Sequence, residues 1–189
     1  GGQGLSLLEF AAVGEELGQS PLGHYIFNCQ APDAGNMEIL IQYGTDEQKE
    51  QYLKPLVQGK VRSCFSMTEP GYPGSNPAWM GASAVKDGDD YVLNGDKWFS
   101  SGADGAAFSI VMAITNPESS SPYLKASMII VPTDTPGFQR IRNTSVMGDA
   151  GSDYASHGEI QLNNCRVPQR NRLGPEGSGF VIAQDRLGP

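Results

Sequence analysis

The spacing of apolar residues changes abruptly after Gly59, and this change sets the limits on the fold. Before it, apolar side chains recur at helical spacing in residues 5–17, 33–43 and 45–57. After it, short apolar runs alternate with turns rich in glycine, proline, asparagine and aspartate. Gly and Pro number 24 and 13 of 189 residues, which is consistent with many turns. The pattern predicts an α+β protein, with helices first and an antiparallel sheet or barrel of about 110 residues after them.

The helical stretches carry start and stop signals. Gly18 and Gly44 follow the first and second, and Thr45 with Gln48 has the spacing of a capping box at the start of the third. Pro55 is expected to kink the last turn of the third helix or to end it early. The residues expected to face the core are Met37, Leu40, Ile41, Tyr52, Leu53, Leu56 and Val57.

Short strands are expected beyond residue 60. The residues 87–90 predict a hairpin turn, and Asn94-Gly95 predicts a second turn. A last helix is expected from Gly179, with Phe180, Ala183 and Leu187 on one face. The expected strands cover residues 61–67, 82–86, 91–93, 108–114, 127–131, 159–162 and 165–167.

Charge and composition exclude several classes of function. The net charge is −8 and the sequence pI is near 4.7, which argues against nucleic acid as the main partner. No apolar run approaches the ~20 residues that a membrane-spanning helix needs. Cys29, Cys64 and Cys165 are far apart, and their spacing fits neither a disulfide framework nor a zinc site. The first residue is Gly1 and no secretory signal follows, so we expect a piece of a longer protein.

Two runs carry candidate chemistry. Residues 65–76 join a strand to a loop rich in glycine and proline, where the main chain can approach a ligand closely. A strand ending in tight turns explains the same run equally well. Residues 97–102 place two aromatics beside two serines, which suits a flat heteroaromatic ligand. A core tryptophan followed by turn serines is the alternative.

Together these runs resemble the acyl-CoA dehydrogenase family. The matching motifs cover essentially the whole chain and occur in the family's order. The sequences of Ser100-Ser101 and of residues 183–189 are similar to those of the subgroup that in animals is fused to a kinase-like domain. The motifs are Gly1-Gly2-Gln3-Gly4-Leu5, Gly44-Thr45-Asp46-Glu47-Gln48-Lys49, Met67-Thr68-Glu69-Pro70 with Gly74-Ser75, Asn94-Gly95 with Lys97-Trp98, Val167-Pro168, and Gly177-Ser178-Gly179-Phe180.

The resemblance implies a fold and an activity. Residues 1–60 would be part of an N-terminal helical domain, 61–174 a β-barrel-like middle domain, and 175–189 the start of a C-terminal helical domain. Members bind FAD and desaturate acyl-CoA thioesters: a carboxylate removes the α-proton and the β-hydrogen leaves as hydride to flavin N5. An acyl-CoA oxidase or flavin monooxygenase of the same fold, or a binding module without activity, remain alternatives.

The resemblance also assigns residues. Trp98, Phe99 and Ser100 match the family's W-I-T triplet, with the Ser100 hydroxyl near flavin N5 and O4. Ser75 matches a serine that contacts both FAD and the acyl-CoA, although the loop before it is one residue longer than usual and Asn76 replaces an aspartate. The residues implied to bind the cofactor are Phe65, Met67, Thr68, Ser75, Trp98, Phe99 and Ser100.

No catalytic residue is expected in this chain, because the family's catalytic glutamate lies in the C-terminal domain, beyond Pro189. Glu69 lies in the motif, but it matches a structural glutamate of the loop. His157 is expected to be satisfied locally, and no metal site is expected. The implied partners are acyl-CoA, an electron-transfer flavoprotein and further copies of the parent, a dimer or tetramer. The location would be cytoplasmic in a bacterium and mitochondrial or peroxisomal in a eukaryote.

Overall fold

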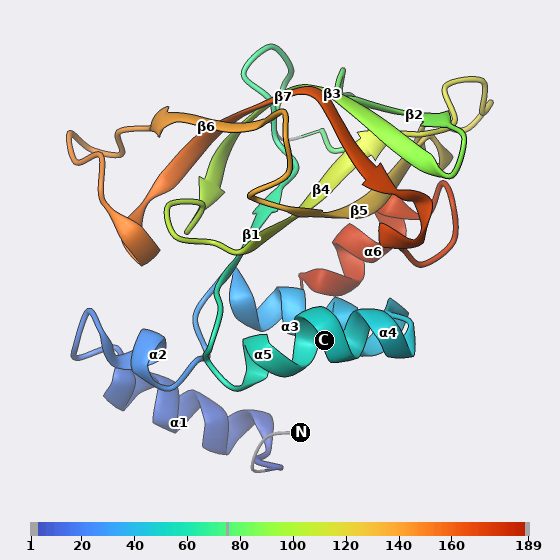
Figure 1. The fold of residues 1–189 in the computed structure, drawn as a ribbon. Coiled ribbons are helices and arrows are strands. Elements are labelled where there is room, and N and C mark those ends of the chain that lie inside the picture. Colours follow the sequence, from blue (N-terminus) through green and yellow to red (C-terminus); the bar gives the residue numbers. More distant parts are fainter. Residues whose placement is uncertain (1–3, 75, 188–189) are drawn as a thin grey trace.

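A computed structural model describes residues 4–74 and 76–187, with a mixed sheet lying over a layer of helices (Figure 1). The described helices are α1 (Leu7–Leu17), α2 (Gly23–Ile26), α3 (Asp33–Tyr43), α4 (Asp46–Gln48), α5 (Lys54–Val57) and α6 (Gly179–Arg186). The strands are β1 (Ser63–Ser66), β2 (Ser83–Asp87), β3 (Asp90–Ser101), β4 (Phe108–Ile114), β5 (Ala126–Pro132), β6 (Phe138–Asn143), β7 (His157–Pro168) and β8 (Arg172–Leu173). This confirms the α+β class, with helices before and after the sheet.

The strand order is β6-β7-β3-β2-β4-β5-β8, and β1 pairs with β4. Most pairs are antiparallel as expected, but β1 and β2 each run parallel to β4. The purely antiparallel expectation was therefore wrong at these two pairs. Parallel pairing needs crossover connections, and apolar periodicity along a single strand does not report them.

The β2–β3 hairpin turns at Gly88-Asp89, as expected from the sequence. The second expected turn, at Asn94-Gly95, was wrong: β3 continues through it, with an irregular register against β7. Gly95 has φ 140°, and a Cβ there would lie 2.7 Å from the Cα of Ala82. The glycine therefore permits a close approach of two main chains within the sheet.

Strand β4 has both faces buried, as its continuous apolar run predicts. One core cluster lies within the bent sheet and includes Val111, Ile129 and Ile160. The second lies between the sheet and the helices and includes Phe108 and Ile110 from β4. Burial on both sides of a strand explains why its residues do not alternate with polar ones.

Helix α3 spans residues 33–43 and ends at Gly44, as predicted, and the capping box of Thr45 and Gln48 is formed. Two residues expected in the core were placed wrongly: Ile41 and Val57 are 53% and 56% exposed. In α3, Leu40 is buried as expected, and the other inward positions are taken by Asp33, Asn36 and Ile39. Two of those are polar, so an apolar pattern could not find them.

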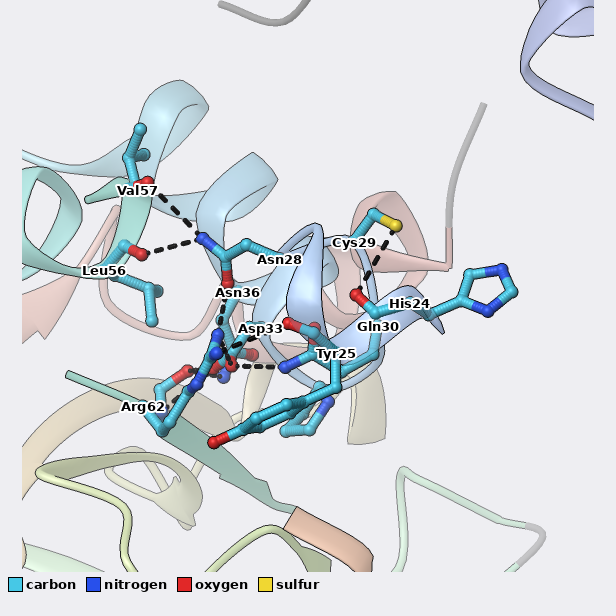
Figure 2. Close-up of polar contacts among 12 residues, drawn as sticks. His24, Tyr25, Asn28, Cys29, Gln30, Asp33, Asn36, Leu56, Val57 and Arg62 are labelled. Carbon is cyan, nitrogen blue, oxygen red and sulfur yellow. Dashed lines mark hydrogen bonds and ion pairs between the residues drawn. The ribbon is translucent and has the colours of Figure 1, made fainter. Parts of the chain in front are cut away.

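The helix after Thr45 passes through Pro55 and ends at Val57. A π-helical turn at Lys49–Leu53 precedes the proline, and the N–H of Lys54 donates to the carbonyl of Lys49. The helix thus ends at Val57 as expected. Of the two effects expected of Pro55, an early end does not occur, because the wider turn changes the hydrogen-bond pattern just before the ring. Asn28 then caps this helix by donating from Nδ2 to the Leu56 carbonyl at 2.9 Å, as Figure 2 shows.

A polar joint connects the helices to β1. The Arg62 guanidinium lies 4.2 Å from the ring of Tyr25 and 3.5 Å from Asp33 (Figure 2). Asp33 also accepts from both the N–H and the hydroxyl of Ser63. Asn36, which is fully buried, donates to the Ser63 hydroxyl at 2.9 Å. This joint fixes the strand that leads into the residue 65–76 motif.

Among residues 4–74 and 76–187, no helix is long and apolar enough to cross a bilayer. The same part of the chain brings together no group of three or more His, Cys, Asp or Glu suited to a metal ion.

Candidate functional site

The candidate site is built around an irregularity in β3. Against β7, Lys97 is paired with Ile160, and the next paired residue of β3 is Ser100, opposite Gly158. Trp98 and Phe99 therefore share the space opposite a single residue, which is a β-bulge. Phe99 has φ 49°, in the left-handed region that side chains with a Cβ rarely adopt.

The bulge decides which side chains face outward. Side chains normally alternate along a strand, so residues 97 and 100 would lie on opposite faces. With one extra residue between them, both Lys97 and Ser100 point inward and are fully buried. Trp98 is half-buried, Phe99 is 42% exposed, and their ring centroids are 4.9 Å apart in an edge-on arrangement. Two adjacent aromatic rings are thus presented on the outer surface.

The two serines after Phe99 have different surroundings. The Ser100 hydroxyl lies 2.8 Å from that of Ser66, which lies 2.8 Å from that of Ser109, so all three form a buried chain. Ser101 is half-buried, and its hydroxyl lies 2.8 Å from Nδ1 of His157. The hydroxyl on the outer side, beside Phe99, is therefore that of Ser101.

The residue 65–68 segment lies against the same part of β3. The N–H of Trp98 donates to the carbonyl of Thr68, and the Thr68 hydroxyl donates to the carbonyl of Trp98, both at 3.1 Å. The Thr68 oxygen can still accept a hydrogen bond. Phe65 is covered by the guanidinium of Arg186 from α6, 4.0 Å from the ring centroid. Phe65 thus contributes to packing between β1 and α6.

Glu69 and Lys97 form a buried ion pair that ties the motif loop to β3. Lys97 Nζ donates to the Glu69 carboxylate at 2.7 Å and to the Met67 carbonyl at 2.8 Å. The same carboxylate accepts from the N–H groups of Gly81 and Ala82, at 2.7 and 3.0 Å. Burial lowers the pKa of Lys97. Glu69 therefore accepts three hydrogen bonds within the protein, which hold the motif loop against β3.

The motif loop encloses little space on its inner side. The hollow within the motif loop, lined by Thr68, Tyr72 and Trp79 among others, is only about 10 Å³. That volume suits about one water molecule, whereas cofactor pockets are typically several hundred Å³. Ser75, predicted to contact both cofactor and substrate, lies outside the described residues.

Three other polar or titratable residues, Arg166, Cys64 and His24, lie outside the candidate site. Arg166 pairs with Asp87 and Asp90 across the hairpin turn, which accounts for the aspartates that the sequence places there. Cys64 is fully buried, and burial raises the pKa of its thiol to about 11, so it is an inert core residue. In Figure 2 the ring of His24 points away from the polar joint.

Sequence comparison identifies the class of protein. The sequence model of the acyl-CoA dehydrogenase middle domain matches residues 64–165, and that of the N-terminal domain matches residues 1–60. This chain belongs to the acyl-CoA dehydrogenase family, a family of oxidoreductases that generally bind FAD.

Particular relatives match nearly the whole chain. Acyl-CoA dehydrogenase family member 11 of Gallus gallus is 49% identical over 98% of this chain and 24% of its own length. FadE2 of Mycobacterium tuberculosis is 48% identical over 98% of this chain and 46% of its own. A structure of this family from Mycobacterium abscessus has a TM-score of 0.93 and 43% identity, over 100% of this chain and 46% of that one. The chain thus spans less than half the length of these relatives.

The donor set fits a flavin ring. A planar ring system needs a flat apolar surface and hydrogen-bonding groups at its edge. The outer surface here offers the rings of Trp98 and Phe99. The Thr68 hydroxyl is bonded to the main chain of Trp98, and the Ser101 hydroxyl contacts His157, whose ring centroid lies 6.5 Å from that of Phe99. Sequence reasoning did not assign Ser101 to the site, whereas His157 is satisfied locally, as expected, by its contact with Ser101. The sequence signal that could have indicated Ser101 was the pair of consecutive aromatic residues in one strand. Consecutive residues of a strand share a face only through a bulge, and a bulge changes which of the following serines faces outward.

Proposed function

We propose that this chain forms one wall of the FAD site of an acyl-CoA dehydrogenase that desaturates acyl-CoA thioesters. The observation that carries the proposal is the β3 bulge, which presents Trp98 and Phe99 together beside the Ser101 hydroxyl. When bound, FAD would accept the hydride that leaves the β-carbon of the substrate. The chain's own residues would hold the ring: the aromatics shield it, and the hydroxyls meet its polar edge.

Within that site, we assign the flavin-edge hydroxyl to Ser101 in place of Ser100. The Ser100 hydroxyl is fully buried and hydrogen-bonded to Ser66, so it could reach a ligand only after the core had opened. Ser101 follows the bulge on the outer side and needs no such rearrangement. Thr68 keeps its predicted role, since its oxygen can accept from the ring while its proton goes to Trp98.

The wall is not expected to catalyse the reaction alone. Glu69 is bound by Lys97 and by two main-chain N–H groups, so it cannot serve as a mobile base for the substrate α-proton. The base is expected in the part of the parent that follows this chain. The acyl-CoA, an electron-transfer flavoprotein and copies of the parent remain its proposed partners.

The test is a titration of FAD followed by intrinsic fluorescence, with the 189-residue chain and with its full-length parent. We expect Trp98→Ala and Ser101→Ala to weaken binding, and Ser100→Ala to reduce stability without changing the affinity of the folded protein. A full-length parent that binds no FAD would refute the proposal. Reduced parent that is reoxidised directly by oxygen would indicate an oxidase instead of a dehydrogenase.

A further inference from the structure

The pair formed by Ser101 and His157 is placed by the sheet itself. The two residues are opposite one another in the β3–β7 register, and the Oγ–Nδ1 distance is 2.8 Å. Both strands are held at this end: the N–H of Gly102 donates to the carbonyl of Ser156 at 2.9 Å, and the N–H of Thr144 donates to the carbonyl of His157 at 2.7 Å. The imidazole and the hydroxyl are therefore held in contact before any ligand arrives.

The surroundings of the pair point toward the proposed flavin position. The Phe99 ring centroid lies 6.5 Å from that of His157, so the imidazole, the hydroxyl and the exposed aromatic share one side of the sheet. Ser101 and His157 are both half-buried, which leaves them open to a ligand stacked over that side.

We propose that His157 is a positioning residue that sets the direction of the Ser101 hydroxyl toward the flavin edge. A neutral imidazole can either donate or accept at Nδ1, depending on the tautomer. When Nδ1 carries the proton it donates to Ser101 Oγ, and the serine proton is free to point outward. When Nδ1 is bare it accepts the serine proton, and Oγ offers only lone pairs.

These two arrangements match the two states of the flavin ring. N5 of oxidised flavin is an acceptor, whereas N5 of reduced flavin carries a hydrogen and is a donor. A serine paired with histidine can donate to N5 of oxidised flavin and accept from N5 of reduced flavin, because the histidine tautomer can change while the heavy atoms stay in place. Removal of the imidazole should therefore alter the balance between binding of oxidised and reduced flavin. This inference rests on the proposed flavin site.

The test measures the affinity of the full-length parent, stripped of cofactor, for oxidised and for dithionite-reduced FAD. His157→Phe keeps a ring and removes Nδ1, and we expect it to change the ratio of the two dissociation constants by about two- to tenfold, the worth of one hydrogen bond. His157→Asn retains a donor and acceptor near the Nδ1 position and should restore most of the ratio. His24→Phe, on α2 with its ring pointing away from the polar joint (Figure 2), is the control and should leave the ratio unchanged.

Each outcome bears on the inference. Wild-type binding of FAD with an unaltered ratio in His157→Phe would overturn the role of His157 and leave the proposed function intact. Absence of FAD binding in the wild type would overturn both. If His157→Phe fails to fold, Ser101→Ala serves in its place: its ratio must shift, and adding His157→Asn must cause no further shift. A further shift in that double variant would show that His157 acts independently of Ser101, against the proposal.

Discussion

The ion pair of Glu69 and Lys97 gives the sharpest test of how the motif loop is held. Lys97→Met would leave the Glu69 carboxylate buried with only the N–H groups of Gly81 and Ala82 as donors. Removal of one partner from a buried pair typically destabilises a protein by about 3–5 kcal/mol, and we expect the lower end because two donors remain.

A matched surface pair provides the control. Lys86 and Glu176 are also 2.7 Å apart, but their side chains are 47% and 30% exposed, compared with 0% and 5% for Lys97 and Glu69. Lys86→Met should therefore leave the free energy of unfolding almost unchanged, since exposed ion pairs contribute little. The two lysines differ in burial and not in distance, which isolates the effect of the surroundings.

The assay is urea denaturation followed by tryptophan fluorescence, with the free energy of unfolding compared at constant m-value. The double variant Glu69→Gln with Lys97→Met removes both charges and should recover part of the loss, because no unpaired charge stays buried. Equal and small losses for Lys97→Met and Lys86→Met would refute the reasoning.

Three further predictions follow from burial and backbone geometry. The pKa of the Cys64 thiol is raised to about 11 from an ordinary value of 9.0, so the folded state keeps its proton through that window. Stability should therefore fall as pH rises from 9 to 11, with Cys64 contributing about 1.4 kcal/mol per pH unit. Burial also raises the pKa of Cys165 to about 11, so Cys64→Ala should reduce the slope in pH-dependent denaturation and leave the part contributed by Cys165. Gly95→Ala should lower the thermal midpoint strongly, because the added Cβ would collide with the neighbouring main chain. Gly88 has open space around it, so Gly88→Ala should lower the free energy of unfolding by only about 1 kcal/mol, for its positive φ. Equal losses for the two variants would contradict this. Leu8→Glu should raise solubility without loss of stability because Leu8 is 82% exposed, whereas Leu40→Glu should unfold the chain; light scattering and circular dichroism distinguish these outcomes.

Local signals in the sequence were sufficient for much of the fold. Helix α3 ends where Gly44 stops it, the Thr45–Gln48 capping box forms as written, and β4 spans the continuous apolar run at residues 108–114. The β2–β3 hairpin turns within the predicted residues 87–90. These features depend on neighbours a few residues apart, so each can be read from a short window.

Exposure was predicted less well, because it depends on what covers each face. Ile41 and Val57 have the expected periodicity, yet no described element packs closely enough to bury them. Helix α1 shows the same effect along its whole length, since it is apolar at helical spacing and has no buried residue. Periodicity identifies an apolar face, and only the three-dimensional arrangement shows its partner.

For the candidate site, the sequence by itself determined the class of residues: two aromatics, two serines and a threonine in motifs typical of the family. The tertiary structure decided which serine faces outward. Alternation from Lys97 would place Phe99 inside and Ser100 outside, but pairing with β7, some sixty residues later in the chain, inserts a bulge and reverses them. The register between distant strands is set by packing of the whole sheet, and therefore Ser101 and His157 meet only in the folded protein.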